Sequence, residues 1–194
     1  MMKKNLLIPI WMTLATTVLL GILYPLAVTG LAQWAFPRQA NGEIIHVGGK
    51  MVGSSLIGQP FSSAGYFHSR PSAAGSAGYD PDASGGGSAN LGPTNSALIT
   101  RVNGDVAKLQ AENPGARIPA DLVTSSGSGL DPHVSPAAAE FQVARVARER
   151  GMSEGDVRGI VAKHTEGRQW GFLGEPRVNV LELNLELDAV RPLR

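Results

Sequence analysis

Cysteine is absent from this chain of 194 residues. Its absence excludes a disulfide framework, thiol catalysis and metal sites that depend on thiolate ligands. Histidine is scarce as well, and the few that occur do not have the paired spacing of a metal-binding motif. We therefore expect no bound metal, and interpret all four histidines as structural: His46, His68, His133 and His164.

Two motifs that handle phosphate groups are also missing. The glycine-rich segments 48–58 and 85–92 are not followed by the lysine of a G-x-x-x-x-G-K-[ST] loop. An Asp-Lys-Thr-Gly phosphorylation signature does not occur either. We therefore expect that the chain does not hydrolyse ATP by either familiar route.

A Ser/His/Asp set can be assembled from Ser128, Asp131 and His133, but its spacing does not fit a catalytic triad. Gly-Ser-Gly at 127–129 is shorter than the five-residue G-x-S-x-G elbow. Residues only two positions apart also rarely orient each other as base and supporting carboxylate. We interpret Asp131-Pro132 as a turn that leads into a helix, and we expect no catalytic residues.

Charged residues are missing between Lys4 and Arg38. About 20 apolar residues suffice to cross a hydrocarbon core about 30 Å thick, and a single spanning segment must be helical because its backbone polar groups need internal partners. We predict a transmembrane helix over 6–34, with its core at about 8–30. Its anchoring side chains include Leu7, Trp11, Leu19, Leu23, Leu26 and Trp34.

A cleavable signal peptide is the alternative, because Lys3 and Lys4 also suit a positively charged n-region. The apolar stretch is, however, about twice as long as a typical h-region and continues past a weak cleavage option at 28–30. We therefore favour an anchor. By the positive-inside bias, residues 1–5 are expected in the cytoplasm and residues 35–194 in one extracytoplasmic domain.

The predicted outer domain is nearly neutral. Lys3, Lys4 and Arg38 are three of the 17 basic residues, which leaves 14 against 16 acidic ones in the rest of the chain. This balance argues against nucleic acid as a partner. Arg70 and the three arginines at 145, 148 and 150 are candidates for anion binding. We interpret the three as exposed charges that complement a helix dipole.

Turn and periodicity signals predict an α+β domain, with strands early and late and helices between them. A hairpin is expected over 42–54, with Gly48-Gly49 as its turn. Three helices are expected: one capped by Thr94 or Asn95 and stopped by Asn113-Pro114-Gly115, one from Ser135-Pro136 to Gly151, and one from Ser153 to near Gly167.

Leucines alternate with polar residues near the C-terminus. Leu181, Leu183, Leu185 and Leu187 are separated by Glu182, Asn184 and Glu186. This period of two predicts a strand over 181–188 with one buried face, and a bulge near Val180-Leu181.

Residues 62–96 are rich in glycine and serine, yet they carry bulky and hydrogen-bonding side chains for which a flexible linker has no use. We interpret the segment as an ordered irregular loop.

Five segments, in order, resemble the C subunit of bacterial Kdp-type potassium-transporting ATPases. They are 53–59 (GSSLIGQ), 66–72 (YFHSRPS), 84–95 (SGGGSANLGPTN), 121–139 (DLVTSSGSGLDPHVSPAAA) and 174–185 (GEPRVNVLELNL). The resemblance extends over nearly the whole chain, including the single anchor. The 84–95 segment is slightly longer than the SGGSN pattern of the family, which concerns only the local loop.

This resemblance implies a complex in the bacterial plasma membrane. Its other members are a channel-like subunit that selects and carries potassium, a P-type subunit that hydrolyses ATP, and a very small membrane peptide. The resemblance implies that this chain is non-catalytic, is needed for assembly and stability, and acts as a catalytic chaperone that raises the ATP affinity of the P-type subunit.

A direct ATP contact is also implied by the resemblance, with Gln59, Ser126 and Ser128 as candidate residues. The predicted topology opposes this contact, because it places these residues outside the cytoplasm, where ATP is scarce.

We expect the segment 53–96 to dock on the outer face of the potassium-selecting subunit, because it has the composition of an ordered loop with few charges. The candidate interface residues are Tyr66, Phe67, His68, Arg70, Asn90 and Asn95. The rival interpretation is a membrane-tethered exported enzyme or ligand-binding module. That function would need a convergent set of polar residues, which the sequence does not show.

Overall fold

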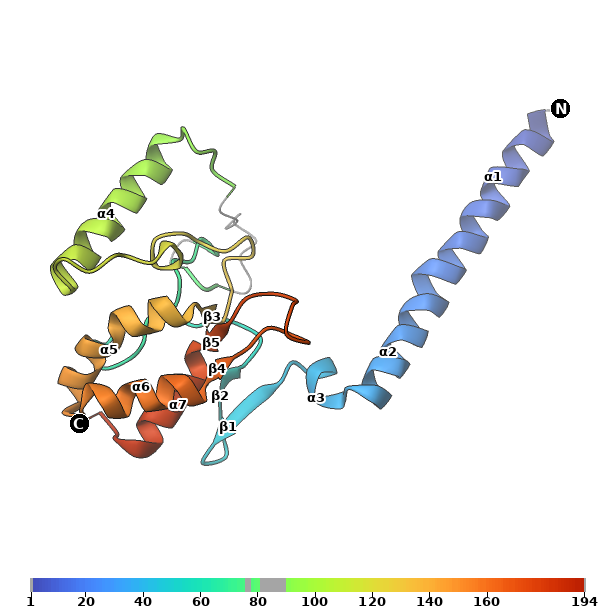
Figure 1. Cartoon of the computed structure of the whole chain (residues 1–194). Coiled ribbons are helices and arrows are strands. Elements are labelled where there is room, and N and C mark those ends of the chain that lie inside the picture. Colours follow the sequence, from blue (N-terminus) through green and yellow to red (C-terminus); the bar gives the residue numbers. More distant parts are fainter. Residues whose placement is uncertain (1, 76–77, 81–89, 194) are drawn as a thin grey trace. The chain divides into compact units, whose positions relative to one another are not determined.

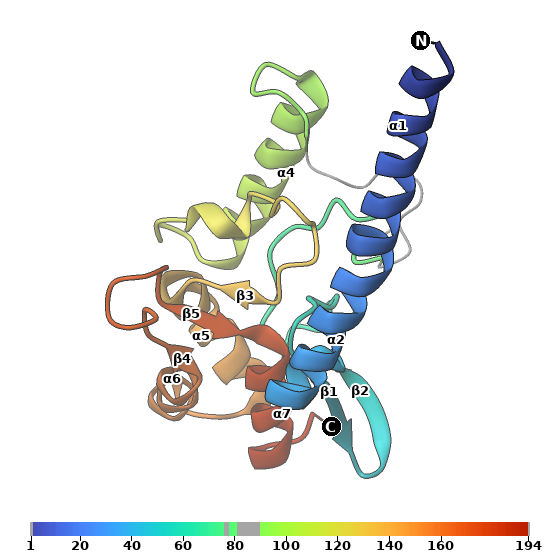
Figure 2. The same cartoon turned by 90° about the vertical axis from the view of Figure 1, so that its right-hand side faces the viewer.

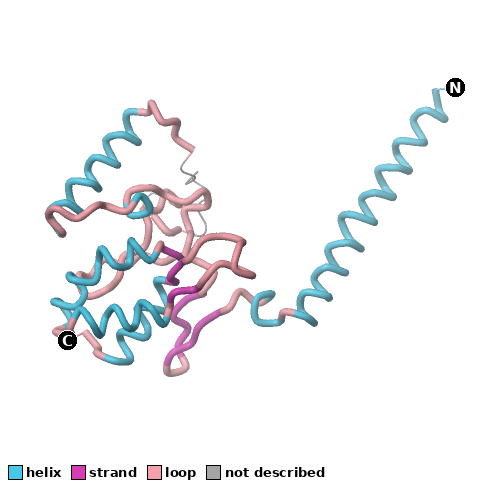
Figure 3. The backbone as a smooth tube through the Cα atoms, viewed as in Figure 1, coloured by secondary structure: helices cyan, strands magenta, loops and turns pink. Residues whose placement is uncertain are grey.

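A computed structural model describes residues 2–75, 78–80 and 90–193. The chain divides into two units, Met1–Val52 and Gly53–Arg194. Helices and short strands both occur, as Figure 3 shows, which confirms the predicted α+β class with one apolar N-terminal helix.

The first unit begins with one long helix, built from α1 (Met2–Thr16), η1 (Thr17–Leu23) and α2 (Tyr24–Ala35) (Figure 1). The most apolar 18-residue stretch within Asn5–Ala35 has a mean hydropathy of 2.2, and the 31-residue span is long and apolar enough to cross a membrane. Its large side chains are exposed in the isolated chain, including all six predicted anchor residues. The helix is therefore a candidate membrane span by its length and composition.

The middle of this helix, η1, is a π-helix. It precedes Pro25, which has no backbone N–H and whose ring would clash with the carbonyl four residues earlier, that of Gly21. Just before the proline, the N–H of Tyr24 bonds to the carbonyl of Leu19, five residues back, and not to the carbonyl four residues back as in an α-helix. A widened turn of this kind accommodates the proline without breaking the helix.

A short helix, α3 (Pro37–Ala40), leads into the hairpin of β1 (Ile44–Val47) and β2 (Lys50–Ser54). Gly48 and Gly49 connect the strands with φ of 57° and 79°. A two-residue hairpin turn of this type requires positive φ at both positions, which glycine adopts at little cost. The predicted hairpin is confirmed.

The second unit holds the remaining elements. The helices are α4 (Ser96–Glu112), the 3₁₀ turn η2 (Ala120–Leu122), α5 (Pro136–Arg150), α6 (Glu154–Lys163) and α7 (Val180–Val190). The strands β3 (His133–Val134), β4 (Thr165–Glu166) and β5 (Arg177–Asn179) form a small antiparallel sheet in the order β3-β5-β4 (Figure 2). Val178 of β5 pairs with both Val134 and Thr165, so β5 is the central strand.

Side-chain caps start the three predicted helices. Asn95, Ser135 and Ser153 each accept a hydrogen bond from a backbone N–H in the first turn of α4, α5 and α6, respectively. The three helices are confirmed. Helix α6 ends at Lys163, before the expected Gly167, because the chain turns there into β4.

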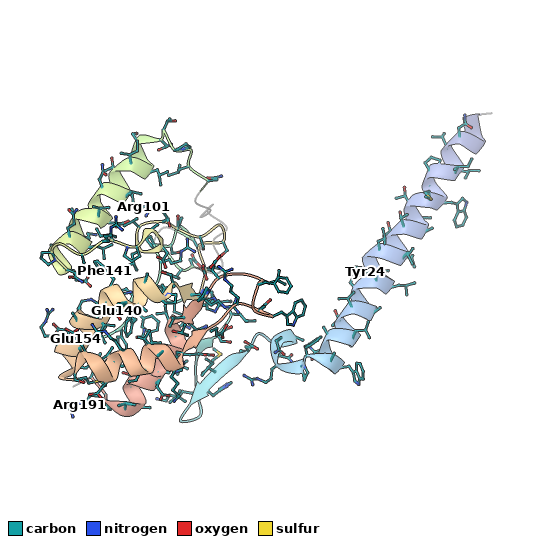
Figure 4. The ribbon with its side chains drawn as sticks, in the orientation of Figure 1. Tyr24, Arg101, Glu140, Phe141, Glu154 and Arg191 are labelled. Atoms are coloured by element: carbon teal, nitrogen blue, oxygen red, sulfur yellow. The ribbon has the colours of Figure 1, made fainter. Side chains whose placement is uncertain are left out.

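Polar contacts along its length, including a 2.7 Å ion pair between Glu112 and Arg145 of α5, tie helix α4 to the rest of its unit. Arg101 donates to the carbonyl of Val123 at 3.2 Å, and Asn113 Nδ2 donates to the carbonyl of Phe141 at 3.2 Å. Figure 4 labels Arg101 on α4 and Phe141 on α5. On the outer side of α5 and α6, Arg158 joins Glu140 to Glu154 with two 2.8 Å bonds.

The predicted C-terminal strand is wrong, because residues 180–190 form helix α7. Asn179 caps the helix by accepting a hydrogen bond from the N–H of Glu182 at 3.1 Å. The most buried positions are Val180, Leu183, Asn184 and Leu187, which have the i, i+3, i+4, i+7 spacing of one helix face. The predicted bulge near 180–181 is instead the junction between β5 and α7.

Helices α5, α6 and α7 pack around the central strand and enclose the hydrophobic core. Its buried side chains are Phe67, Leu122, Val134, Ala138, Ala139, Phe141, Val143, Val146, Ala147, Val157, Val161, Val178, Val180, Leu183 and Leu187. Phe67 is the one core side chain in this set that comes from the irregular segment before α4. The segment is therefore part of the folded unit.

The helical face of α7 predicts unequal effects of two neighbouring leucines. Leu183→Ala should lower the free energy of unfolding by about 2–5 kcal/mol, because Leu183 is fully buried. Leu185→Ala should cost clearly less, because Leu185 is only partly buried. Denaturant unfolding of the full chain in detergent, followed by circular dichroism, measures both. Equal losses would instead support the alternating strand.

Candidate functional site

Two buried side-chain amides hold the backbone of residues 67 and 68. Asn184 Oδ1 accepts from the N–H of Phe67 at 2.9 Å, and Asn184 Nδ2 donates to the Phe67 carbonyl at 3.0 Å. Gln142 contacts the N–H and carbonyl of His68 in the same way, at 2.8 Å and 3.1 Å. Each amide therefore takes the place of a neighbouring strand and satisfies both backbone groups of one residue.

Two arginines of α5 hold the carbonyls just before this point. Arg145 Nη1 donates to the carbonyls of Ala64 and Tyr66, at 2.5 Å and 2.8 Å, and Arg150 Nε donates to that of Gly65 at 2.6 Å. Both arginines are buried. Our interpretation of the three arginines of α5 as exposed dipole-complementary charges is therefore wrong for Arg145 and Arg150. Arg148 is exposed.

Tyr66 completes this cluster. Its hydroxyl donates to Asp188 Oδ2 at 3.0 Å, and the guanidinium of Arg150 lies 4.9 Å from the centre of its ring. Arg150 Nη2 also lies 3.0 Å from Asp188 Oδ1. Burial raises the pKa of Tyr66, and the hydrogen bond and negative charge of Asp188 raise it further. We call Gln142, Asn184, Arg145 and Arg150, with the segment 64–68 that they hold, the polar clamp.

The clamp determines where the predicted interface residues lie. Phe67 is fully buried, and Tyr66 is hydrogen-bonded to α7. The His68 ring lies 3.1 Å from the Ser63 carbonyl through Nε2. Burial and the charge of Arg145 lower the pKa of His68. These three residues contribute to the fold of the domain, and their contact with another subunit stays a prediction.

The remaining interface candidates are dispersed. Asn95 caps α4 with its side chain. Asn90 is exposed. It is the last residue of the SGGGSAN segment, and the other residues of that segment lie outside the described residues. Arg70 lies elsewhere, in a polar cleft of about 560 Å³. The cleft is lined by Arg70, Ala120, Asp121, Thr124, Asp131, His133, Val134, Ser135, Glu175, Pro176 and Arg177.

Asp131 is the central acceptor of the polar cleft. Its Oδ2 accepts from Arg70 Nη1 at 2.9 Å, and its Oδ1 accepts from the backbone N–H of His133 at 3.0 Å. Burial alone would raise the pKa of Asp131. The hydrogen bonds from His133 and Arg70, with the positive charge of Arg70, outweigh this effect and lower it.

Asp121 has a structural role in the same cleft. Its carboxylate accepts from the N–H of Ser135 at 2.7 Å and from the Ser135 hydroxyl at 3.1 Å. Ser135 is the N-cap of α5, so Asp121 fixes the start of that helix. Asp121 and Asp131, two carboxylates of the polar cleft, thus already have hydrogen-bond partners within the chain.

The rejected Ser/His/Asp set has structural contacts in the folded domain. His133 Nδ1 lies 3.5 Å from Asp131 Oδ1, and Asp131 also pairs with Arg70. Ser128 Oγ accepts from the N–H of Leu130 at 3.1 Å, as part of a local turn. Among the residues that the structure describes, no group of three or more metal-ligating side chains comes together.

The residues with an implied nucleotide role lie around one loop. Ser126 Oγ accepts from the N–H of Gly129 at 2.9 Å, and the N–H of Gly58, next to Gln59, bonds to the Leu130 carbonyl at 2.8 Å. Segments 58–59 and 126–130 are therefore neighbours. The two serine hydroxyls stabilise the loop backbone, and the nucleotide contact stays a prediction.

A feature that we did not predict lies between β4 and β5. Trp170, Phe172 and Leu173 are 85%, 67% and 43% exposed, in a turn closed by two 2.9 Å backbone bonds between Gln169 and Leu173. The rings of Trp170 and Phe172 lie 6.4 Å apart. We call residues 169–173 the aromatic tip. The sequence signal for this turn is the glycine between two aromatic residues. The signal can be interpreted as a hairpin turn only when the flanking strands β4 and β5 are known.

The structure thus defines a class of protein, an α+β domain that follows one candidate membrane span. The family model for the c chain of the K⁺-transporting ATPase, KdpC, matches residues 6–189. A Koribacter versatilis protein named "Potassium-transporting ATPase KdpC subunit" is 64% identical over 99% of this chain and 98% of its own length. Proteins of the same name from Caulobacter vibrioides and Rhodopseudomonas palustris are 59% and 53% identical, and the alignments cover 91% and 98% of this chain and 88% and 100% of theirs.

The chain belongs to the KdpC family. It is a subunit of a potassium-transporting ATPase complex, as the resemblance in its five sequence segments implied.

The polar clamp predicts a large loss of stability when one amide is removed. Asn184→Ala should lower the free energy of unfolding by about 2–5 kcal/mol, because it leaves two buried backbone groups of Phe67 without partners. Asn103→Ala, at an exposed position of α4, is the matched control and should change the free energy by about 0.5 kcal/mol or less. A similar effect of both substitutions in chemical unfolding would contradict the role of the clamp.

The lowered pKa of Asp131 predicts a pH-dependent contribution to stability. A folded-state pKa below the unfolded value stabilises the fold above about pH 4, and this stabilisation disappears as the pH falls through the lowered folded pKa. Asp131→Asn should therefore lower the unfolding free energy at neutral pH and flatten its acid dependence. Glu149→Gln, in an exposed ion pair with Arg148, is the control. Parallel acid profiles for wild type and Asp131→Asn would contradict the assignment.

Proposed function

We propose that this chain is the non-catalytic accessory subunit of a high-affinity, ATP-driven potassium uptake complex. In this role it supports assembly of the complex and raises the affinity of the ATP-hydrolysing subunit for ATP. The family match over residues 6–189 is the observation that carries the proposal. The partners are a potassium-selecting channel-like subunit, a P-type ATP-hydrolysing subunit and a small membrane peptide.

We propose further that the domain lies outside the cytoplasm. Two lysines precede the apolar helix, and no charge follows it before Arg38. The positive-inside bias then places the short N-terminus in the cytoplasm. In this topology the domain meets the potassium-entry side of the complex.

The contacts around the loop 126–130 support an indirect effect on ATP. Ser126 and Ser128 stabilise their own backbone, and Asp131 is paired with Arg70. A role as chaperone then depends on a conformational preference. If this subunit binds one state of the complex more tightly, and that state has the higher ATP affinity, the two binding events are coupled without shared contacts.

The proposal predicts a change in the ATP dependence of hydrolysis. The complex should be purified with and without this chain, and its ATPase rate measured over a range of ATP concentrations. Without the chain, the apparent KM for ATP should rise about 5-fold or more, which is the lower end of typical allosteric coupling. The chain alone should show no turnover, because it lacks both phosphate-handling motifs.

Three outcomes would count against parts of this proposal. An unchanged ATP dependence would contradict the chaperone role, and failure of the chain to purify with the other subunits would contradict its role in assembly. Protease treatment of spheroplasts that leaves the domain intact, while cleaving it in lysed spheroplasts, would place it in the cytoplasm.

A further inference from the structure

The aromatic tip has an unusual backbone for its sequence. Trp170 and Gly171 have φ of 53° and 83°, and the N–H of Phe172 bonds to the carbonyl of Gln169 at 3.2 Å. These are the features of a hairpin turn that requires positive φ at both central positions, where Asn, Asp and Gly are preferred. A bulky residue at the first of these positions is an outlier with a cost in stability.

Trp170 gains little within the chain in return for this cost. Its side chain is 85% exposed, and its recorded ring contact is to Phe172, which is itself 67% exposed. The backbone bonds between Gln169 and Leu173 hold this strained turn, and strain that is held at an exposed side chain points to a function outside the packing of the chain itself. Trp and other aromatic residues are also the residue types that most often anchor protein interfaces.

The charges near the tip are neutralised within the hairpin. Arg168 pairs with Glu175 at 2.6 Å, and Arg177 pairs with Glu166 at 2.9 Å. Glu175 and Arg177 also line the polar cleft. The apolar tip therefore stands beside a polar, internally paired rim, which is the arrangement of a small protein interface with an apolar centre.

We propose that the aromatic tip is a docking anchor that inserts into an apolar socket on another membrane subunit of the same complex. This inference rests on the proposed function and names the surface that performs the docking. Trp170 and Phe172 enter the socket, and the polar cleft faces its rim.

The charge and size of the tip select this occupant over two others. Contacts with an anionic bilayer surface use an excess of Lys and Arg, whereas the four charged residues of this hairpin balance. The tip offers three apolar side chains, Trp170, Phe172 and Leu173. They would bury far less than the roughly 1,200–2,000 Å² of a stable interface between free proteins, which disfavours a second copy held by the tip alone. A small anchor suffices when both partners are held in one membrane, because the tether raises their effective concentration.

Crosslinking identifies the occupant directly. The photoreactive residue benzoylphenylalanine would replace Phe172 in the full chain, and the assembled complex would be irradiated in its native membrane. We expect a crosslink to another subunit. The same residue in place of Val190, which is 56% exposed on α7, is the control position and should give no comparable product. A product formed only with lipid, only with a second copy of this chain, or not at all would overturn the proposal.

Exchange kinetics test the energy of docking. Labelled wild-type chain would be added to detergent-purified complexes that carry wild type, Trp170→Asn or the control Val190→Ser. Trp170→Asn should be replaced about 30-fold faster, which corresponds to the loss of one interface hot spot. Val190→Ser should exchange at the wild-type rate, and equal rates for all three would overturn the inference.

Stability of the free chain separates docking from folding. Because Asn suits the positive φ at position 170, Trp170→Asn should leave the thermal unfolding midpoint of the full chain unchanged or raise it by a few degrees. A lowered midpoint would show that Trp170 stabilises the fold. If the wild-type chain fails to join the complex, the proposed function fails. If it joins and the exchange rates are equal, only the role of the tip fails.

Discussion

The fold of the second unit depends on how a buried irregular segment satisfies its backbone. Residues 64–68 are not in a helix or a strand, yet Phe67 is in the centre of the core. Buried peptide groups without partners would cost several kcal/mol. Gln142, Asn184, Arg145 and Arg150 supply those partners from α5 and α7. The positions of both helices are therefore fixed by directional polar bonds as well as by apolar packing.

This constraint separates the residues that build the domain from those left for contact. Tyr66, Phe67 and Arg145 are committed to the clamp, and Arg70 and Asp131 to each other. Their substitution acts first on stability, so loss of assembly in such variants would not locate an interface. Trp170 and Phe172 have the opposite character, because they are exposed and contribute few internal contacts.

Local signals in the sequence were sufficient to predict much of the fold. The caps at Asn95, Ser135 and Ser153 act on backbone groups within the next turn, so their effect is visible from the sequence alone. The predicted C-terminal strand was wrong because a period of two over four leucines also fits a helix. It places Leu183 and Leu187 four residues apart, on one helix face. Asn179 as a cap and the burial of Asn184 distinguish the helix, and the second depends on contacts with a segment 117 residues away.

The clamp arginines and the tip were missed for the same reason. Arg145 and Arg150 bond to carbonyls 79 to 85 residues earlier in the chain, and no spacing rule encodes such pairs. The exposure of Trp170 likewise follows from strands β4 and β5, each too short to be recognised by periodicity. The family resemblance predicted the complex to which the chain belongs. It did not indicate which side chains are buried and which are exposed.

The candidate span changes what a small docking surface can achieve. A strained turn costs on the order of 1–3 kcal/mol, which a free protein of marginal stability would rarely retain for a weak contact. A tethered domain samples its partner at high effective concentration, so a few aromatic side chains are enough to set its orientation. Weak, oriented docking also permits release during a transport cycle, since the tether keeps the domain nearby after the tip dissociates. Strong docking at the same tip would instead hold the complex in one state.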